Sequence, residues 1–133
     1  MTLFVDTSVW SLALRRDSPP GSPEVLRLGQ ALETGETVLS TGLVLQELLQ
    51  GFYGPTDVDA ILLRFAHVPL LSPDRRDHIE AAALRSRCRR AGIQVATVDA
   101  LLAQLCVHHD LPLLTTDKDF IHIATVTPLR VWT

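Results

Sequence analysis

The chain has 133 residues, of which 47% are hydrophobic and 20% charged, and its formal net charge at pH 7 is -3. A chain of this length is about one domain and can bury a core without disulfides, so we expect a single domain over residues 1–133. The charge argues against nucleic-acid binding over a broad basic surface, but it allows a small acidic site that binds metal. No apolar run is long enough to span a membrane, and we expect a soluble protein without a membrane partner.

Cys88 and Cys106 lack the close spacing of a disulfide framework or a zinc site. No secretory leader precedes the first predicted strand, so reduced thiols and a cytoplasmic location are the simplest interpretation. The histidines also lack metal-ligand spacing, and we assign none of them to a metal.

Short apolar runs alternate with longer helical patterns along the chain, which is typical of an α/β fold. In chain order, we expect a strand at 3–5, helices at 7–15 and 23–34, a strand at 37–40, helices at 42–50 and 57–66, a strand at 67–71, helices at 73–91 and 98–109, a strand at 113–115, a helical turn at 117–123 and a strand at 129–131. The first strand is continuously apolar, as in a buried parallel sheet. Pro69 demotes the third strand to an edge of the sheet.

Local signals mark where the predicted helices begin and end. Ser22 and Ser72, each followed by a proline, and Thr97 are predicted N-caps. Gly35 stands where a C-terminal cap belongs. The proline and glycine content of residues 17–21 predicts a loop.

Carboxylates stand at the ends of several predicted elements. Asp6 closes the first strand, Glu47 lies in the helix after the second strand, Asp99 opens the long apolar helix, and Asp117 and Asp119 follow the fourth strand. Each also has an ordinary structural explanation. Asp6 and Asp117 can cap helices, Glu47 can belong to a solvated polar stripe, and Asp99 can simply stabilise a helix N-terminus.

Together, these acids predict more than helix caps. The carboxyl ends of parallel strands meet at one edge of a sheet, where open α/β proteins bind ligands, so Asp6, Asp99 and Asp117 should come together. Clustered carboxylates repel, and without nearby basic residues they need raised pKa values or a divalent cation. An all-oxygen ligand set favours Mg²⁺ or Mn²⁺ over zinc. Such a cation can activate water and stabilise a phosphate under in-line attack.

Four sequence blocks, in this order, resemble PIN-domain ribonucleases and more narrowly the VapC-type toxins of bacterial and archaeal toxin–antitoxin pairs. The blocks are residues 5–10 (VDTSVW), 45–51 (LQELLQG), 96–103 (ATVDALLA) and 114–120 (LTTDKDF). Each block alone is weakly specific. Four of them across nearly the whole chain are strongly specific.

The resemblance implies roles for individual residues. The family's acidic quartet of catalytic groups and metal ligands falls on Asp6, Glu47, Asp99 and Asp117, with Asp119 as a further metal contact and Thr115 and Thr7 as polar helpers. In this interpretation, three aspartates supply oxygens to one or two cations. Glu47 is either a ligand of the second cation or the base for the attacking water.

The resemblance also implies a three-layer α/β/α sandwich with a mostly parallel five-stranded sheet. The implied activity is Mg²⁺- or Mn²⁺-dependent cleavage of RNA phosphodiester bonds, in a homodimer that a cognate antitoxin inhibits. Other functions stay open: a PIN nuclease that is not a toxin, an inactive PIN binding module, and an aspartate-based phosphate-transfer protein. The last is disfavoured, because Ser8 stands where dehalogenase-like phosphatases carry a second acid, and the acid pair of a receiver domain is missing.

Two groups of residues outside the acids are candidates for substrate contact. Four arginines between residues 85 and 90 form a basic patch, which can bind RNA phosphates or complement the dipole at a solvated helix end. Trp10, Phe52 and Tyr53 flank the predicted site and can stack on bases. Core packing is the commoner role of such aromatic residues.

Overall fold

The computed structural model describes residues 1–15, 21–52 and 54–133. In chain order, the described elements are β1 (Leu3–Val5), α1 (Thr7–Leu14), α2 (Pro23–Thr34), β2 (Val38–Thr41), α3 (Gly42–Gly51), α4 (Pro55–Phe65), β3 (Leu70–Leu71), α5 (Arg75–Arg90), α6 (Thr97–His108), β4 (Leu113–Leu114) and α7 (Lys118–Ala124). The predicted alternation of strands and helices is confirmed. Most of the predicted loop at 17–21 lies outside the described residues. None of the described helices is long and apolar enough to cross a membrane.

The strands form one parallel sheet in the order β3-β2-β1-β4. β1 is flanked on both sides, with Leu3 opposite Val38 of β2 and Val5 opposite Leu114 of β4. β3 pairs with β2 alone and is the edge strand that Pro69 predicts. Because all the strands run in the same direction, the residues that follow β1 and β4 lie at the same edge of the sheet.

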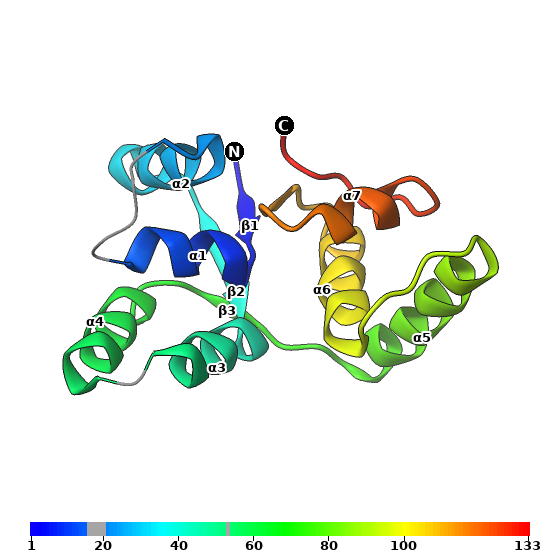
Figure 1. Cartoon of the computed structure of the whole chain (residues 1–133), viewed down its shortest axis with the longest axis horizontal. Helices are drawn as coiled ribbons and strands as arrows, with labels where there is room; N and C mark the ends of the chain where they lie inside the picture. Colours follow the sequence, from blue (N-terminus) through cyan, green and yellow to red (C-terminus); the bar gives the residue numbers. More distant parts are fainter. Residues whose placement is uncertain (16–20, 53) are drawn as a thin grey trace.

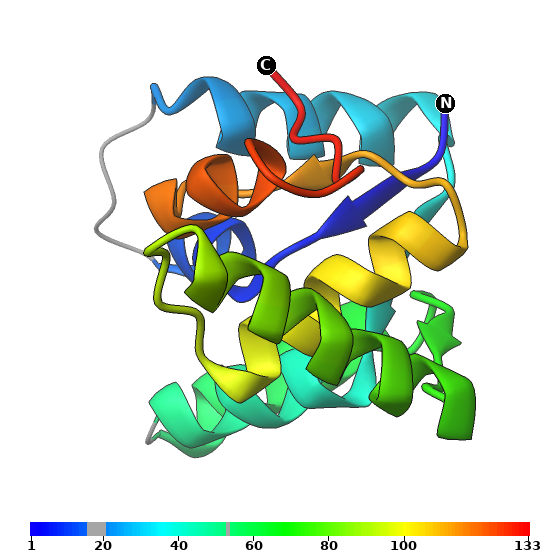
Figure 2. The same ribbon diagram turned by 90° about the vertical axis from the view of Figure 1, so that its right-hand side faces the viewer.

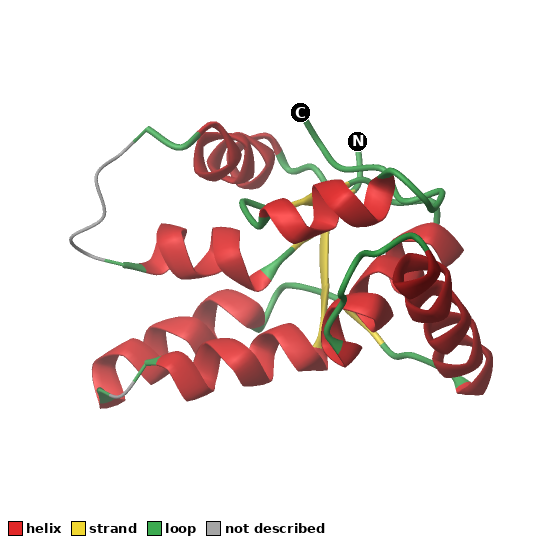
Figure 3. Ribbon diagram, turned by 45° about the vertical axis from the view of Figure 1, so that its right-hand side comes forward, coloured by secondary structure: helices red, strands yellow, loops and turns green. Residues whose placement is uncertain are grey.

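Helices cover both faces of this sheet. α1 to α4 lie on one side and α5 to α7 on the other (Figure 1), and Figure 3 shows the strands enclosed between the two groups. Figure 2 shows α5 lying in front of α6, against which it packs. The predicted three-layer sandwich is therefore confirmed.

β1 is the centre of the hydrophobic core. Each of its three residues is fully buried, which explains the continuous apolar run in the sequence. Trp10 of α1 is 1% exposed and packs against Phe65 of α4, with ring centroids 4.8 Å apart. Phe52 also packs against the core, whereas Tyr53 lies outside the described residues. The core role expected for Trp10 and Phe52 is confirmed.

The predicted C-terminal strand is reduced to a single bridge. Leu113 donates its N–H to the carbonyl of Arg130 at 2.9 Å and accepts from the N–H of Trp132 at 2.9 Å, which makes an isolated parallel bridge with Val131. Pairing stops there because β4 is only two residues long. The described sheet therefore has four strands instead of the expected five.

Two predicted N-caps, Ser72 and Thr97, are wrong. The N-cap of α5 is Asp74, not Ser72: Asp74 Oδ1 accepts from the N–H of Asp77 at 2.8 Å, and Asp77 Oδ2 accepts from the N–H of Asp74 at 3.0 Å. This reciprocal capping box satisfies two donors that a serine two residues earlier cannot reach. α6 includes Thr97, and its N-cap is Ala96, without a side-chain hydrogen bond.

The predicted ends of α2 are confirmed. Ser22 is the N-cap, and its Oγ accepts from the N–H of Val25 at 3.4 Å. Gly35 is the C-cap with φ of 74°, a left-handed conformation in which glycine avoids the clash of a Cβ atom.

A hydrogen bond between Asp77 and His108 joins α5 to α6. Asp77 is 2% exposed, and its Oδ1 lies 2.7 Å from Nδ1 of His108. Burial raises the pKa of Asp77, but the hydrogen bonds from Asp74 and His108 outweigh burial and leave that pKa below its ordinary value. The ionised carboxylate thus holds the start of α5 against the end of α6, the helix that carries Asp99.

Candidate active site

Asp6 lies directly after β1, and hydrogen bonds fix its carboxylate. The residue is 5% exposed. Oδ1 accepts from the N–H of Thr7 at 2.7 Å, and Oδ2 accepts from the hydroxyls of Ser8 and Thr115 at 2.8 and 2.7 Å. Asp6 is also the N-cap of α1. The capping role predicted as an alternative is therefore compatible with a place in the site. Three donors hold this carboxylate in one orientation.

Ser8 and Thr115 connect the ends of β1 and β4. Ser8 Oγ accepts from the N–H of Thr116 at 3.0 Å, and Thr115 Oγ1 accepts from the N–H of Asp117 at 3.0 Å. Each hydroxyl therefore donates to Asp6 and accepts from the backbone that follows β4. Sequence reasoning does not mark Ser8 as a site residue. Its only signal is a hydroxyl two positions after an aspartate that ends a strand.

Asp99, Asp117 and Asp119 meet around a common point. One carboxylate oxygen of each lies within 4.8 Å of the corresponding oxygens of the other two. Asp117 is the N-cap of α7, and its Oδ1 accepts from the N–H of Asp119 at 2.9 Å. Asp99 comes from the first turn of α6. Two helix starts on the same side of the sheet therefore bring three acids together.

Asp99 is half-buried among like charges. Burial raises its pKa, and the negative charges of Asp117, Asp6, Glu47 and Asp119 raise it further, to about 6. The ordinary value is 3.8. The structure thus brings all five predicted acids into one electrostatic environment, although they come from four separate parts of the chain.

Glu47 reaches this environment from α3. The hydroxyl of Thr7 donates to Glu47 Oε1 at 3.0 Å, which joins the first turn of α1 to α3. Within the described part of the chain, Glu47 Oε2 has no hydrogen-bond partner. Thr7 and Thr115, both predicted as polar helpers, therefore each contact one of the predicted acids.

No basic side chain among the described residues forms an ion pair with these carboxylates. The ion pairs among the described residues involve Glu36, Asp77 and Asp110, and none includes an acid of the site. Hydroxyl and amide groups orient the site's acids but leave their charge uncompensated. A set of carboxylate oxygens with excess negative charge fits a hard divalent cation.

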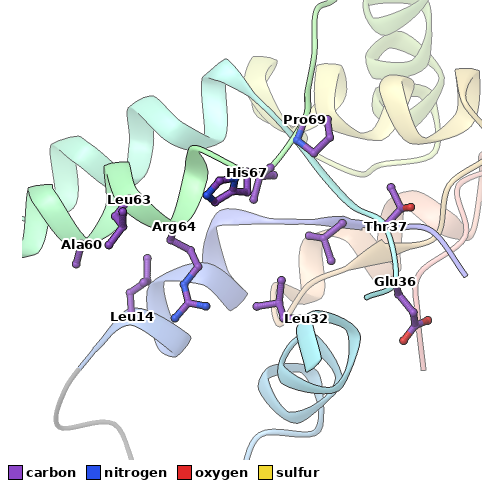
Figure 4. A pocket seen from close by; sticks show the side chains of 11 residues that line it. Leu14, Leu32, Glu36, Thr37, Ala60, Leu63, Arg64, His67 and Pro69 are labelled. Atoms are coloured by element: carbon purple, nitrogen blue, oxygen red, sulfur yellow. The ribbon is translucent and has the colours of Figure 1, made fainter. Parts of the chain in front are cut away.

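A pocket of about 720 Å³ lies apart from the five acids, beside α1, α2 and α4, and is lined in part by Leu14, Leu32, Leu63 and Arg64 (Figure 4). None of the five acids lines it. The acids are therefore grouped at the edge of the sheet and not at the bottom of this pocket.

Comparisons with known proteins concern the family and the fold. The family model described as PIN domain matches residues 3–126. Ribonuclease VapC11 of Mycobacterium tuberculosis is 28% identical over 130 residues, which cover 96% of each chain. Two solved structures share the fold. FitAcB from Neisseria gonorrhoeae has a TM-score of 0.74 and 21% identity, and the match covers 100% of this chain and 97% of that one. VapBC2 from Rickettsia felis, bound to a DNA fragment from their promoter, has a TM-score of 0.78 and 15% identity, and the match covers 100% of both chains.

Proposed function

The chain belongs to the PIN domain family, and we propose that it is a metal-dependent endoribonuclease that hydrolyses RNA phosphodiester bonds. We further propose that it acts in the cytoplasm as the toxin of a toxin–antitoxin pair. The similarity to relatives named as VapC ribonucleases, over 96% of the chain, supports this assignment. One PIN domain then accounts for residues 1–133.

The observation that carries the proposal is the convergence of Asp99, Asp117 and Asp119, each of which places one carboxylate oxygen within 4.8 Å of those of the other two. Burial and the neighbouring negative charges raise the pKa of Asp99 to about 6, so full ionisation of the cluster is unfavourable without a counter-charge. Proteins build such clusters where a cation is to be bound or a proton moved. Helix capping alone requires neither the fifth acid nor the convergence of separate elements.

We assign Mg²⁺ or Mn²⁺ to Asp6, Asp99 and Asp117, with Asp119 as a further ligand. Asp6 Oδ1 accepts a single hydrogen bond and retains a lone pair for a cation. The bound cation supplies Lewis acidity toward a phosphate oxygen and lowers the pKa of a water molecule.

The side chains around the cation have separate tasks. Ser8 and Thr115 orient Asp6 by donating to its Oδ2. Thr7 fixes Glu47 through Oε1, which leaves Oε2 to accept the proton of the attacking water or to contact a second cation. Positioning of this kind lowers the barrier because the groups need no reorganisation during the reaction.

A phosphate-transfer mechanism fits the site less well. In that mechanism, Asp6 would attack phosphorus with a carboxylate oxygen. Both oxygens of Asp6 instead accept hydrogen bonds, Oδ1 from the N–H of Thr7 and Oδ2 from the hydroxyls of Ser8 and Thr115, and these bonds reduce the nucleophilicity of the carboxylate. An inactive binding module differs from a nuclease in activity only, and the following experiment separates the two.

The purified protein is expected to cleave RNA when Mg²⁺ or Mn²⁺ is present and to stop when EDTA removes the cation. Gel analysis of labelled RNA measures the products, and Asp117→Asn controls for a contaminating nuclease. Cleavage that continues in EDTA would contradict the proposed chemistry. A melting temperature that rises with the cation, without any cleavage, would identify an inactive binding module instead.

We propose that the cognate antitoxin docks in the pocket beside α1, α2 and α4. Leu14, Leu32 and Leu63 line this pocket, and Leu63 is 74% exposed. Arg64 extends from α4 toward Leu14 and Leu32 (Figure 4), without a carboxylate partner among the described residues. An adjoining pocket of about 310 Å³ shares Leu14, Leu32 and Arg64 and is also lined by Trp10, whose buried indole N–H has no partner among the described residues. An apolar partner segment with an acidic residue would complement this surface.

Leu63→Arg is expected to weaken binding of the antitoxin at least about tenfold, because it places a charge in an apolar contact. The partner to test is the product of the neighbouring gene, and titration calorimetry measures the affinity. Ile79→Arg is the matched control, since Ile79 is 61% exposed on α5 and does not line the pocket. Equal affinities of both variants would refute this docking site. The homodimer implied by the family resemblance remains a prediction, which sedimentation of the purified chain tests.

A further inference from the structure

A pocket of about 650 Å³ lies between the second half of α5 and the loop that leads into α6. Its lining residues are Arg85, Arg89, Ile93, Gln94, Val95 and Ala96. The loop ends at Ala96, the N-cap of α6, and Asp99 stands in the first turn of that helix. At the helical rise, Ala96 and Asp99 are separated by roughly 5 Å along the axis. The pocket therefore adjoins the acidic site.

Arg85 has a fixed orientation in this pocket. The residue is half-buried, and its Nε donates to the carbonyl of Val95 at 2.7 Å. Within the described part of the chain, its two terminal nitrogens have no hydrogen-bond partner. A guanidinium group held in this way presents two parallel donors, the geometry that matches the oxygens of a phosphate.

The charge of the pocket is not compensated by neighbouring acids. Among the described residues, neither Arg85 nor Arg89 forms an ion pair, whereas Arg27 and Arg130 each donate to a carboxylate. Two arginines on one wall of this pocket thus create a local positive potential in a chain with a net charge of -3.

We propose that Arg85 and Arg89 bind a backbone phosphate of the RNA strand next to the bond that is cleaved. The inference rests on the proposed nuclease function, because it identifies how the substrate is bound at that same site. The acids around Asp99 repel RNA, so affinity must come from cationic side chains outside the cluster. Because the 93–96 loop leads into the helix that carries Asp99, an RNA strand with one phosphate at the acids would bring a neighbouring phosphate to this pocket. Of the four arginines in the basic patch, only Arg87 and Arg90 then have the alternative role of complementing the dipole at a solvated helix end.

The test compares Arg89→Gln with Arg87→Gln. Both arginines are exposed on α5 and carry the same charge, but Arg87 does not line the pocket and is the matched control. The measured quantity is kcat/KM for Mg²⁺-dependent cleavage of a random-sequence single-stranded RNA, as a function of salt. Thermal melting checks that both variants are folded.

Arg89→Gln is expected to lower kcat/KM about tenfold at low salt through KM, with kcat unchanged, because a charge-assisted hydrogen bond to substrate is lost. The slope of log kcat/KM against log salt should flatten by about 0.7, the value for one phosphate contact on a single strand. Arg87→Gln should keep the wild-type slope. Arg85→Lys, which retains the charge without the planar fork, should show the increase in KM but a nearly unchanged slope.

A wild-type slope in Arg89→Gln, or an equal flattening in Arg87→Gln, would overturn the phosphate site. Fluorescence anisotropy with the same RNA in EDTA decides the question without cleavage, since Arg89→Gln must weaken binding more than Arg87→Gln. Binding that depends on Arg89 in a protein without nuclease activity would contradict the proposed function alone. Cleavage that is indifferent to Arg89 would contradict the phosphate site alone.

Discussion

Asp99→Asn is expected to reduce divalent-dependent RNA cleavage at least about a thousandfold, because it removes one ligand charge from the metal site. The same change should raise the stability of the metal-free protein. Asp99 is half-buried, accepts no hydrogen bond from the described residues that asparagine would lose, and is repelled by the surrounding acids. Removing a charge that burial and repulsion both disfavour, discounted for solvent screening, is worth roughly 1 kcal/mol, or about 4 °C in melting temperature for a chain of this size.

Asp6→Asn should lose cleavage to a similar extent but have the opposite effect on stability. Asp6 Oδ2 accepts from the hydroxyls of both Ser8 and Thr115, and Oδ1 accepts from the N–H of Thr7. An amide group offers one acceptor oxygen in place of two, so at least one buried donor loses its partner. The expected loss is about 1–2 kcal/mol of unfolding free energy.

The pair of variants therefore separates catalysis from stability. Cleavage of labelled RNA and thermal melting in EDTA are the two measurements, with Glu80→Gln as a control that removes an exposed acid of α5 that is not among the charges acting on Asp99. Glu80→Gln should leave both quantities unchanged. Retained cleavage in Asp6→Asn and Asp99→Asn would refute the metal site. A lower melting temperature for metal-free Asp99→Asn would refute the repulsion at Asp99.

The convergence of Asp6, Asp99 and Asp117 can be predicted from the sequence because it depends on topology. A continuous apolar run that ends in an acid indicates a buried parallel strand, and parallel strands deliver their last residues to one edge. The same reasoning predicts the edge position of β3 from Pro69. In both cases, the residue type limits the position of the strand: continuous apolar residues require a buried strand, and a proline requires an edge.

Features that depend on tertiary distance are not predictable in this way. Ser8 becomes part of the site only because β4 lies beside β1, which brings Thr115 and the backbone of Thr116 to its hydroxyl. The N-cap of α5 is Asp74 and not the predicted Ser72, because Asp74 and Asp77 form a capping box that satisfies two free backbone N–H groups. The orientation of Arg85 likewise depends on a carbonyl ten residues away.

Mg²⁺ or Mn²⁺ is expected to raise the melting temperature with increasing cation concentration, because the cation binds the folded acid cluster and not the unfolded chain. A concentration one hundred times the dissociation constant contributes about 2.7 kcal/mol of stability. Differential scanning fluorimetry measures the shift, and Asp99→Asn is the control that should abolish most of it. An equal shift in the wild-type protein and Asp99→Asn would place the cation elsewhere on the molecule.

The pH dependence of the metal-free protein tests the same cluster independently. Because the pKa of Asp99 is raised from 3.8 to about 6, the folded state binds more protons than the unfolded state between these values. The stability that protonation of Asp99 contributes is fully present below pH 3.8 and is lost as the pH rises through about 6. Asp77, whose pKa is lowered, contributes to stability in the opposite sense, but equally in the wild-type protein and in Asp99→Asn.

The difference in melting temperature between the wild-type protein and Asp99→Asn should therefore be small near pH 4. It should grow in favour of Asp99→Asn toward pH 7, since only the wild-type protein then carries the fifth charge. Added cation should remove this advantage above about pH 6, where protons no longer compete with it for Asp99. A difference that does not change with pH would mean that Asp99 titrates as an isolated, exposed aspartate.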